Sequence, residues 1–272
     1  MISDPAMYRL VLSVGETTVD AVIVSRVHEN EVIHRRFDIP EATSALAMLR
    51  NIVNENPLLV TDFHKVDLIF GNNRFFLISH DEAEPDEIRR RTDILWPSDR
   101  SEKKYDSLAD TVEDNRTDLV WTIEHDLLSY VRRIWNNPDI HHRIGVMARY
   151  YSLKNHLGNM GKIHAFIADG HTDIIAFARD GLLMANTFKT NAEGSEPSET
   201  TAAYYILAAA KNLDFDAETD RVFVGGSTAL RDNTIALLRN FIPLSMPQLT
   251  DHRSPASTHP DIPAEVALIL AL

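Results

Sequence analysis

One pattern occurs twice in this chain: three short apolar segments separated by turns and followed by a helical segment. In the first copy, Gly15-x-Thr17 follows the apolar segment 10–14. The same motif recurs 155 positions later as Gly170-x-Thr172, after the segment 163–168. The matched order and spacing favour duplication of one α/β unit over chance similarity. The period is far longer than the roughly 20–50 residues of solenoid repeats, so the pattern predicts two related lobes.

The other segments extend this alternation of strands and helices. Apolar and β-branched runs predict strands over residues 10–14, 19–24, 31–37, 66–70, 75–78, 119–123, 163–168, 173–178, 182–188 and 221–224. Helical periodicity predicts a helix beginning at Pro40 and helices over 88–95, 127–135, 145–156, 201–213, 229–241 and 264–272. The turn at 71–73 predicts a hairpin of the strands before and after it. We expect an α/β protein with mixed sheets, whose lobes span residues 1–140 and 141–272 with a cleft between them.

Composition excludes several classes of protein. The chain has 272 residues, enough for a sizeable core, and no cysteine, which excludes disulfide frameworks and thiolate sites. Its 27 basic and 40 acidic residues give a formal net charge of −13, which repels nucleic-acid phosphates. No stretch approaches the roughly 20 apolar residues that span a bilayer, and the first residues do not form a secretion signal. We expect a cytoplasmic protein that binds neither nucleic acid nor the membrane interior.

The negative charge is concentrated between residues 81 and 126. This stretch holds 15 acidic and 7 basic residues. Such blocks are usually solvated, so we expect a solvated face with a flexible loop over 98–110; a docking surface for a basic partner is the alternative. The triplet 89–91, Arg-Arg-Arg, is expected to pair with the surrounding acids.

Familiar catalytic and metal-binding motifs are absent. His141 and His142 are adjacent rather than one helical turn apart, which does not match the H-E-x-x-H zinc motif. The segment 158–162 lacks the spacing of a P-loop, and no G-x-S-x-G occurs. These residues predict no catalytic group and no metal site.

The glycine turns resemble those of the actin-like ATPase superfamily, which includes actin, sugar kinases and heat-shock chaperones and consists of duplicated RNase-H-like lobes. In that superfamily the first turn reads Asp-x-Gly, and the second reads Asp-x-Gly-Gly-Gly-Thr-Thr-Asp. A third motif, Gly-Gly-Ser after an apolar strand, holds the adenosine. Here they correspond to Ser13-Val14-Gly15, to residues 166–173, and to Gly225-Gly226-Ser227.

More narrowly, three segments resemble an uncharacterised bacterial family, of the Bacteroides type, that has a degenerate actin-like fold. These segments are Ile140-His141-His142, Asp173-Ile174-Ile175 and Asn186-Thr187-Phe188-Lys189. The likeness covers most of the chain, and the family has no established activity that could be carried over to this protein.

The superfamily resemblance implies a nucleotide site that has lost its metal ligands. The turn glycines let backbone N–H groups approach phosphate oxygens, while the leading aspartates hold Mg²⁺. Ser13 and Phe166 replace those two aspartates here, and phenylalanine cannot coordinate a hard cation. Without the metal, the charge that develops in phosphoryl transfer is not neutralised. Residues that would contact a nucleotide are Gly15, Thr17, Gly170, Thr172, Gly225, Gly226 and Ser227.

Three functional hypotheses follow. The first is a catalytically inactive scaffold or adaptor with a protein partner, with sensing of ATP and Mg²⁺ as an added role. The second is an ATP-dependent kinase or ATPase whose metal-binding carboxylates have moved to Asp20, Asp169 or Asp173. The third is an interaction module built on the acidic stretch. For Gly225-Gly226-Ser227, an ordinary strand-to-helix turn is the alternative to a nucleotide contact.

Overall fold

The computed structural model describes residues 4–28, 31–41, 43–97, 104–112, 116–155, 160–168, 170–178, 181–190, 198–248, 259 and 261–272. They form two compact units. The first comprises Met1–Thr111, Asp118–Val146 and Asp251–Leu272, and the second comprises Val112–Thr117 and Met147–Thr250. The final segment therefore belongs to the first unit, whereas the sequence-based division placed it in the second lobe. Helix α7 (Ala264–Ile269) accounts for the difference, because it packs against strand β1 of the first unit.

The first unit contains a five-stranded mixed sheet in the order β3-β2-β1-β4-β8. Its strands are β1 (Tyr8–Val14), β2 (Thr18–Ser25), β3 (Val32–Asp38), β4 (Lys65–Phe70) and β8 (Asp139–His142). The first three are antiparallel, as the apolar runs and short turns predict, and β4 and β8 add in parallel.

The second unit repeats this arrangement in the order β11-β10-β9-β12-β13. Its strands are β9 (Lys162–Ala168), β10 (His171–Ala178), β11 (Gly181–Lys189), β12 (Arg221–Gly226) and β13 (Ser245–Pro247). Again three antiparallel strands are followed by two parallel ones. The equal strand order confirms the duplication that the repeated motif predicts. The predicted cleft between the lobes stays a prediction.

Alternating side chains give the first sheet two different faces. On one face, Ala21 and Ile23 of β2 lie near the end of α1 (Ala45–Glu55) and the 3-10 helix η2 (Pro57–Val60). On the other face, Ser13 of β1 contacts α7. Helix α1 also packs against α3 (His125–Ile134). Since successive side chains of a strand point to opposite faces, β1 separates an apolar helical layer from a polar face that α7 covers.

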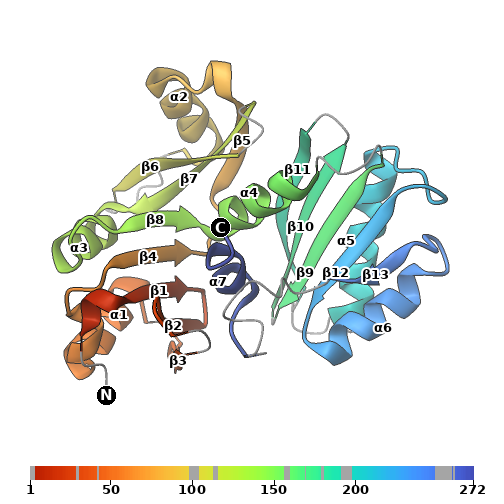
Figure 1. Cartoon of the computed structure of the whole chain (residues 1–272). Helices are drawn as coiled ribbons and strands as arrows, with labels where there is room; N and C mark the ends of the chain where they lie inside the picture. The colour runs from red at the N-terminus through yellow and green to blue at the C-terminus, as the bar shows by residue number, and fades with distance from the viewer. Residues whose placement is uncertain are drawn as a thin grey trace. The chain divides into compact units, whose positions relative to one another are not determined.

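Alanine makes close helix packing possible in the second unit. Helices α5 (Ser198–Asn212) and α6 (Thr228–Leu238) lie side by side on one face of the sheet (Figure 1). Four alanines of α5, at positions 202, 203, 209 and 210, are buried against the β-branched side chains of the strands. Such small side chains let the helix approach the sheet closely. One further helix, α4 (Arg143–Asn155), precedes β9 in the chain.

A three-stranded sheet corrects two predictions. Its order is β5-β7-β6, with β5 (Phe75–Ser79), β6 (Tyr105–Thr111) and β7 (Thr117–Glu124). The predicted hairpin of 66–70 with 75–78 is therefore wrong, because β4 and β5 belong to different sheets. The predicted loop over 98–110 is wrong for residues 105–110, which form β6; residues 98–103 lie outside the described part of the chain.

Two helices begin at residues other than those predicted. Helix α1 begins at Ala45 rather than Pro40, because the Ser44 hydroxyl accepts a hydrogen bond from the Ala47 N–H and caps it. Helix α2 (Pro85–Leu95) begins at Pro85, three residues before the predicted start. The 3-10 helices η1 (Pro5–Met7) and η3 (His80–Glu82) complete the described elements. Within the described residues, no helix has both the length and the apolar content to span a membrane.

Candidate functional site

The first predicted turn follows β1 directly. The Gly15 N–H donates a 2.9 Å hydrogen bond to the Thr18 carbonyl, and Thr17 is exposed in this turn. Ser13, where the resemblance places an aspartate, is buried, and its hydroxyl donates a 2.6 Å hydrogen bond to Oε1 of Glu265 on α7. No sequence pattern indicates this contact, because the two residues are 252 positions apart.

The second turn joins β9 to β10. Gly170 has a φ of 83°, a conformation that glycine adopts readily, and its carbonyl accepts a 3.0 Å hydrogen bond from the Thr190 N–H. Thr172 is fully buried, and its hydroxyl has no hydrogen-bond partner among the described residues. Asp169, one of the proposed relocated carboxylates, lies outside the described residues.

An aromatic ring lies directly over Gly225. This glycine is in register with Phe166 of the adjacent β9, and a Cβ added to it would lie 2.7 Å from the Phe166 ring. The ring is buried, with its centroid 5.8 Å from that of Tyr151. Phe166 therefore fills the space above Gly225, at the second position where the resemblance places an aspartate.

Two further predicted residues of the second unit, Gly226 and Thr172, lie in one row across the sheet. Gly226 is in register with Ile167, which is in turn in register with Thr172. Ser227 precedes α6 but makes no side-chain capping hydrogen bond. The sheet thus aligns Gly226 with Thr172 on either side of β9, while Gly15 and Thr17 belong to the first unit.

Two buried carboxylates occupy equivalent places in the two sheets. Asp20 lies on β2 opposite Ser13, and Asp173 lies on β10 opposite Phe166. Each carboxylate is less than 4% exposed. The duplicated unit therefore retains an acid on its second strand, beside the strand where the resemblance expects one.

These two carboxylates already have partners. Asp20 lies 2.6 Å from Nε2 of His34 and 2.9 Å from Nε of Arg36, both on β3. Asp173 accepts a 2.7 Å hydrogen bond from the Thr187 hydroxyl on β11. A metal ion at either carboxylate would have to displace these contacts.

An electrically neutral histidine is buried beside Phe166. His164 stacks on Tyr151 at a centroid distance of 3.9 Å and on Phe223 at 5.1 Å. Its Nδ1 lies 2.8 Å from Oε1 of Gln248. Burial lowers the pKa of His164 to about 4, despite the opposing hydrogen bond to Gln248. The imidazole therefore acts as an uncharged packing group at neutral pH.

A network of charges lies on the polar face of the first sheet, around the fully buried Asp67 of β4. Its Oδ2 lies 2.6 Å from Nε of Arg9, and its Oδ1 lies 3.3 Å from Nζ of Lys65. The same ammonium lies 2.9 Å from Oδ2 of Asp139 on β8. Burial raises the pKa of Asp67, but contacts with His141, Arg9 and Lys65 outweigh it and lower the pKa to about 2.

His141 of β8 lies between Asp67 and a further acid, Asp110 of β6. Its Nε2 is 3.7 Å from Oδ1 of Asp67, and its Nδ1 is 3.4 Å from Oδ1 of Asp110 on β6. Burial lowers the pKa of His141, but the two carboxylates outweigh this effect and raise it to about 9. The other Asp110 oxygen accepts a 2.8 Å hydrogen bond from the His142 N–H, which fixes this carboxylate.

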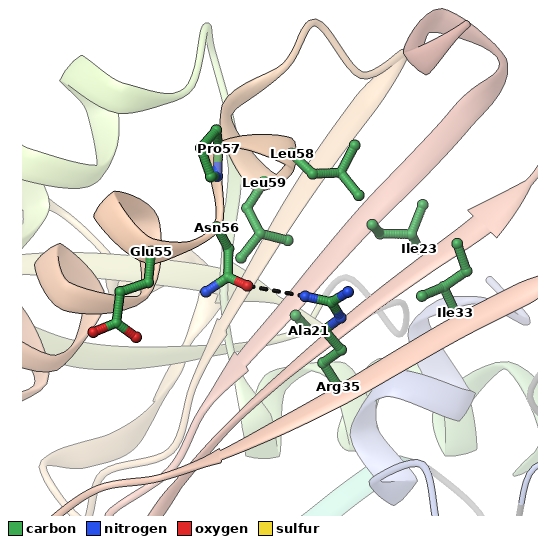
Figure 2. Close-up of a pocket in the computed structure, with 9 residues that line it drawn as sticks. All are labelled: Ala21, Ile23, Ile33, Arg35, Glu55, Asn56, Pro57, Leu58 and Leu59. Carbon is green, nitrogen blue, oxygen red and sulfur yellow. Dashed lines mark hydrogen bonds between the residues drawn. The ribbon is translucent and has the colours of Figure 1, made fainter. Parts of the chain in front are cut away.

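A small cavity lies on the opposite face of the first sheet (Figure 2). It has a volume of about 180 Å³, and mostly apolar side chains line it. Arg35 of the edge strand β3 extends along it and donates a 3.0 Å hydrogen bond to Oδ1 of Asn56. The lining residues are Ala21, Ile23, Ile33, Arg35, Glu55, Asn56, Pro57, Leu58 and Leu59.

Local ion pairs with arginine engage two acids of the acidic stretch, Glu82 and Glu87. Glu87 lies 2.6 Å from both Arg90 and Arg91, and Arg91 also pairs with Glu82. The predicted local pairing of the arginine triplet is thus confirmed for two of its members. Two histidine–aspartate contacts also lie in this stretch, His80 with Asp118 and His125 with Asp106.

Comparison with known proteins places the fold. A family model for DUF3822, described as a protein of unknown function, matches residues 2–244. A crystal structure from Bacteroides thetaiotaomicron, of a protein with an actin-like ATPase fold and unknown function, has a TM-score of 0.80 at 18% identity. The match covers 100% of this chain and 99% of that one.

A second solved structure, from the PilM-PilN type IV pilus biogenesis complex, has a TM-score of 0.60 at 11% identity and covers 98% of each chain. No match was found among curated proteins. At these identities the likenesses show the fold, which is the predicted actin-like ATPase fold with a sheet in each of its two lobes.

Proposed function

The chain belongs to the DUF3822 family, a family of unknown function, and from its fold and strand-end side chains we propose that it is a catalytically inactive adaptor. One observation carries this proposal: both positions expected to hold metal-binding aspartates are engaged in internal contacts. Ser13 is bonded to Glu265, and Phe166 packs over Gly225. Phosphoryl transfer requires neutralisation of developing charge, and neither side chain offers the carboxylate that would hold a metal ion for it.

Nucleotide binding is testable separately from hydrolysis. A nucleotide that approaches Gly225 from the side of Phe166 would have to displace the buried ring. We expect Mg·ATP to leave the melting temperature of the wild-type chain unchanged. Phe166→Ala would uncover Gly225 and serves as the comparison. A shift in the wild type that Gly170→Val removes would instead assign a nucleotide-sensing role to the glycine turns.

The partner is proposed to be a protein that binds at the edge of the first sheet. Strand β3 ends the sheet, and the apolar cavity opens beside it (Figure 2). Among the described residues, Arg35 pairs with the neutral Asn56 amide and with no carboxylate. An extended partner segment could add to β3, placing an apolar side chain in the cavity and a carboxylate on Arg35.

Two further points support a protein partner. The structurally similar PilM-PilN complex shows this fold in an assembly with another protein. The net charge of −13 disfavours nucleic acid as the ligand. We propose a cytoplasmic location for the adaptor.

Photo-cross-linking in the native host tests this surface. A photoreactive amino acid at Ile33, inside the cavity, should give one adduct of discrete mass, while the same group at the exposed Val60 should not. Arg35→Glu should abolish the adduct, and Arg35→Lys should retain part of it. Equal adducts at both positions, or an adduct that survives Arg35→Glu, would contradict the proposed surface.

A further inference from the structure

We propose that Asp67, Asp139 and His141 form a binding site for a divalent transition-metal ion, with Zn²⁺ as the best match. The site is independent of the proposed adaptor function. Asp67 is in register with Asp139 on the adjacent parallel strand, and His141 lies two residues further along β8. Side chains two residues apart on a strand point to the same face, so all three converge on the polar face of the sheet. One ligand atom from each lies within 4.8 Å of the others.

The spacing is close to that of a zinc site. Bonds of about 2.0–2.1 Å in tetrahedral geometry place neighbouring ligand atoms roughly 3.3 Å apart. Oδ1 of Asp67 and Nε2 of His141 are already 3.7 Å apart. Asp139 has a half-exposed side chain, so it can move the remaining distance. One imidazole and two carboxylates form a mixed nitrogen and oxygen ligand set that suits Zn²⁺.

The buried carboxylate oxygen of Asp67 points into this site. Oδ1 is buried and accepts no hydrogen bond, whereas Oδ2 is held by Arg9. The contacts of Oδ1 are ion pairs instead, with Lys65 at 3.3 Å and His141 at 3.7 Å, so both of its neighbours are groups that a metal ion would replace or recruit. The nearest cation is Lys65, whose ammonium lies between the two carboxylates, 3.3 Å from Asp67 and 2.9 Å from Asp139.

Lys65 shows that this position attracts a cation, and it can leave. Its side chain is 41% exposed and flexible, so the ammonium can swing into solvent when a metal ion replaces it. The remaining contacts match the outer shell of a metal site. Asp110 lies 3.4 Å from Nδ1 of His141, which leaves Nε2 directed at Asp67, and the proton on Nε2 would be released to solvent when the metal ion binds. Metal-bound histidines commonly have such a carboxylate on the second ring nitrogen.

Calorimetric titration of the full chain with ZnCl₂, after treatment with a chelator, tests the site. We expect one equivalent to bind to the wild type. Asp139→Asn and His141→Gln should each weaken binding at least about tenfold, in the range seen for loss of metal-site contacts. Lys65→Met removes the competing ammonium and should strengthen binding several-fold, an effect that a purely structural ion-pair network would not produce.

A matched control is His125→Gln, which removes an exposed histidine paired with Asp106 and should leave Zn²⁺ binding unchanged. Circular dichroism confirms that each variant is folded. Co²⁺ titration gives a second readout, because a tetrahedral site produces visible absorption. Absence of stoichiometric Zn²⁺ binding to both the wild type and Lys65→Met would overturn the proposal. Binding that persists unchanged in Asp139→Asn and His141→Gln would overturn it as well.

Discussion

Position 226 requires glycine because of its backbone conformation and the closeness of the adjacent strand. Its φ is +120°, and a Cβ would lie 2.2 Å from the Ile167 carbonyl oxygen on the adjacent strand. We expect Gly226→Ala to lower the free energy of unfolding by at least about 2 kcal/mol, since both the conformation and the contact are unfavourable. Gly15→Ala is the comparison, because its nearest contact would be 3.3 Å, with the Thr18 carbonyl oxygen. Equal stability losses in denaturant titrations would contradict this explanation.

The buried His164 should make the free energy of unfolding depend on pH. Its pKa is lowered to about 4 in the folded chain by burial, against an ordinary value of 6.5. Between these values the unfolded state binds the proton more readily, so stability is fully present above pH 6.5 and declines as the pH falls toward 4. The shift corresponds to about 3 kcal/mol.

His164→Phe keeps an aromatic ring between Tyr151 and Phe223 but cannot titrate. The difference between wild-type and variant unfolding free energies should therefore vary over pH 4–6.5 and be constant above it. A difference that is the same at every pH would show that this histidine does not govern the dependence.

Helix α7 is attached to the first sheet through a buried hydrogen bond. The Ser13 hydroxyl donates to Glu265 over 2.6 Å. Ser13→Ala leaves the carboxylate without this donor and should cost about 1–3 kcal/mol of unfolding free energy. Glu265→Gln keeps an acceptor oxygen and should cost less than Glu265→Ala. In a double-mutant cycle of the two alanine variants, strictly additive losses would show that the pair does not interact.

Elements with a simple periodic pattern could be predicted from the sequence, and those set by tertiary contacts could not. The strands of the two repeated units are apolar and β-branched, so their positions and their duplication were predictable. Strand β6 (Tyr105–Thr111) is polar and half-exposed along its length, which gave it the composition of a loop. The turn after β4 suggested a hairpin, but turn residues do not specify which strand the next segment pairs with.

The candidate sites show the same division. The glycine turns follow from short motifs, whereas the Ser13–Glu265 contact joins residues at opposite ends of the chain. The Asp67 cluster likewise depends on the alignment of β4 with β8, which no local pattern reveals. Adjacent histidines at 141 and 142 argued against a metal site on a helix, but the proposed site combines Asp139 and His141 of β8 with Asp67 of the neighbouring strand β4.

At the scale of the molecule, duplication has preserved the sheets and altered the strand ends differently in each copy. Both sheets have the same strand order and a buried aspartate on the second strand, Asp20 or Asp173. The first copy has a serine beside this acid, and the second has a phenylalanine. The actin-like ATPase fold is therefore retained, while Ser13 and Phe166 occupy the two positions where the resemblance places aspartates.

Phosphate release from ATP in the presence of Mg²⁺, measured at high protein concentration, tests this claim most directly. Because Ser13 offers only a neutral hydroxyl bonded to Glu265, and Phe166 offers no ligand atom, we predict release no faster than in buffer alone. Asp169→Ala is the matched variant, since Asp169 is the carboxylate of the second turn that could still substitute. Release above the buffer rate by the wild type, abolished by Asp169→Ala, would show that the protein is an ATPase and contradict the account.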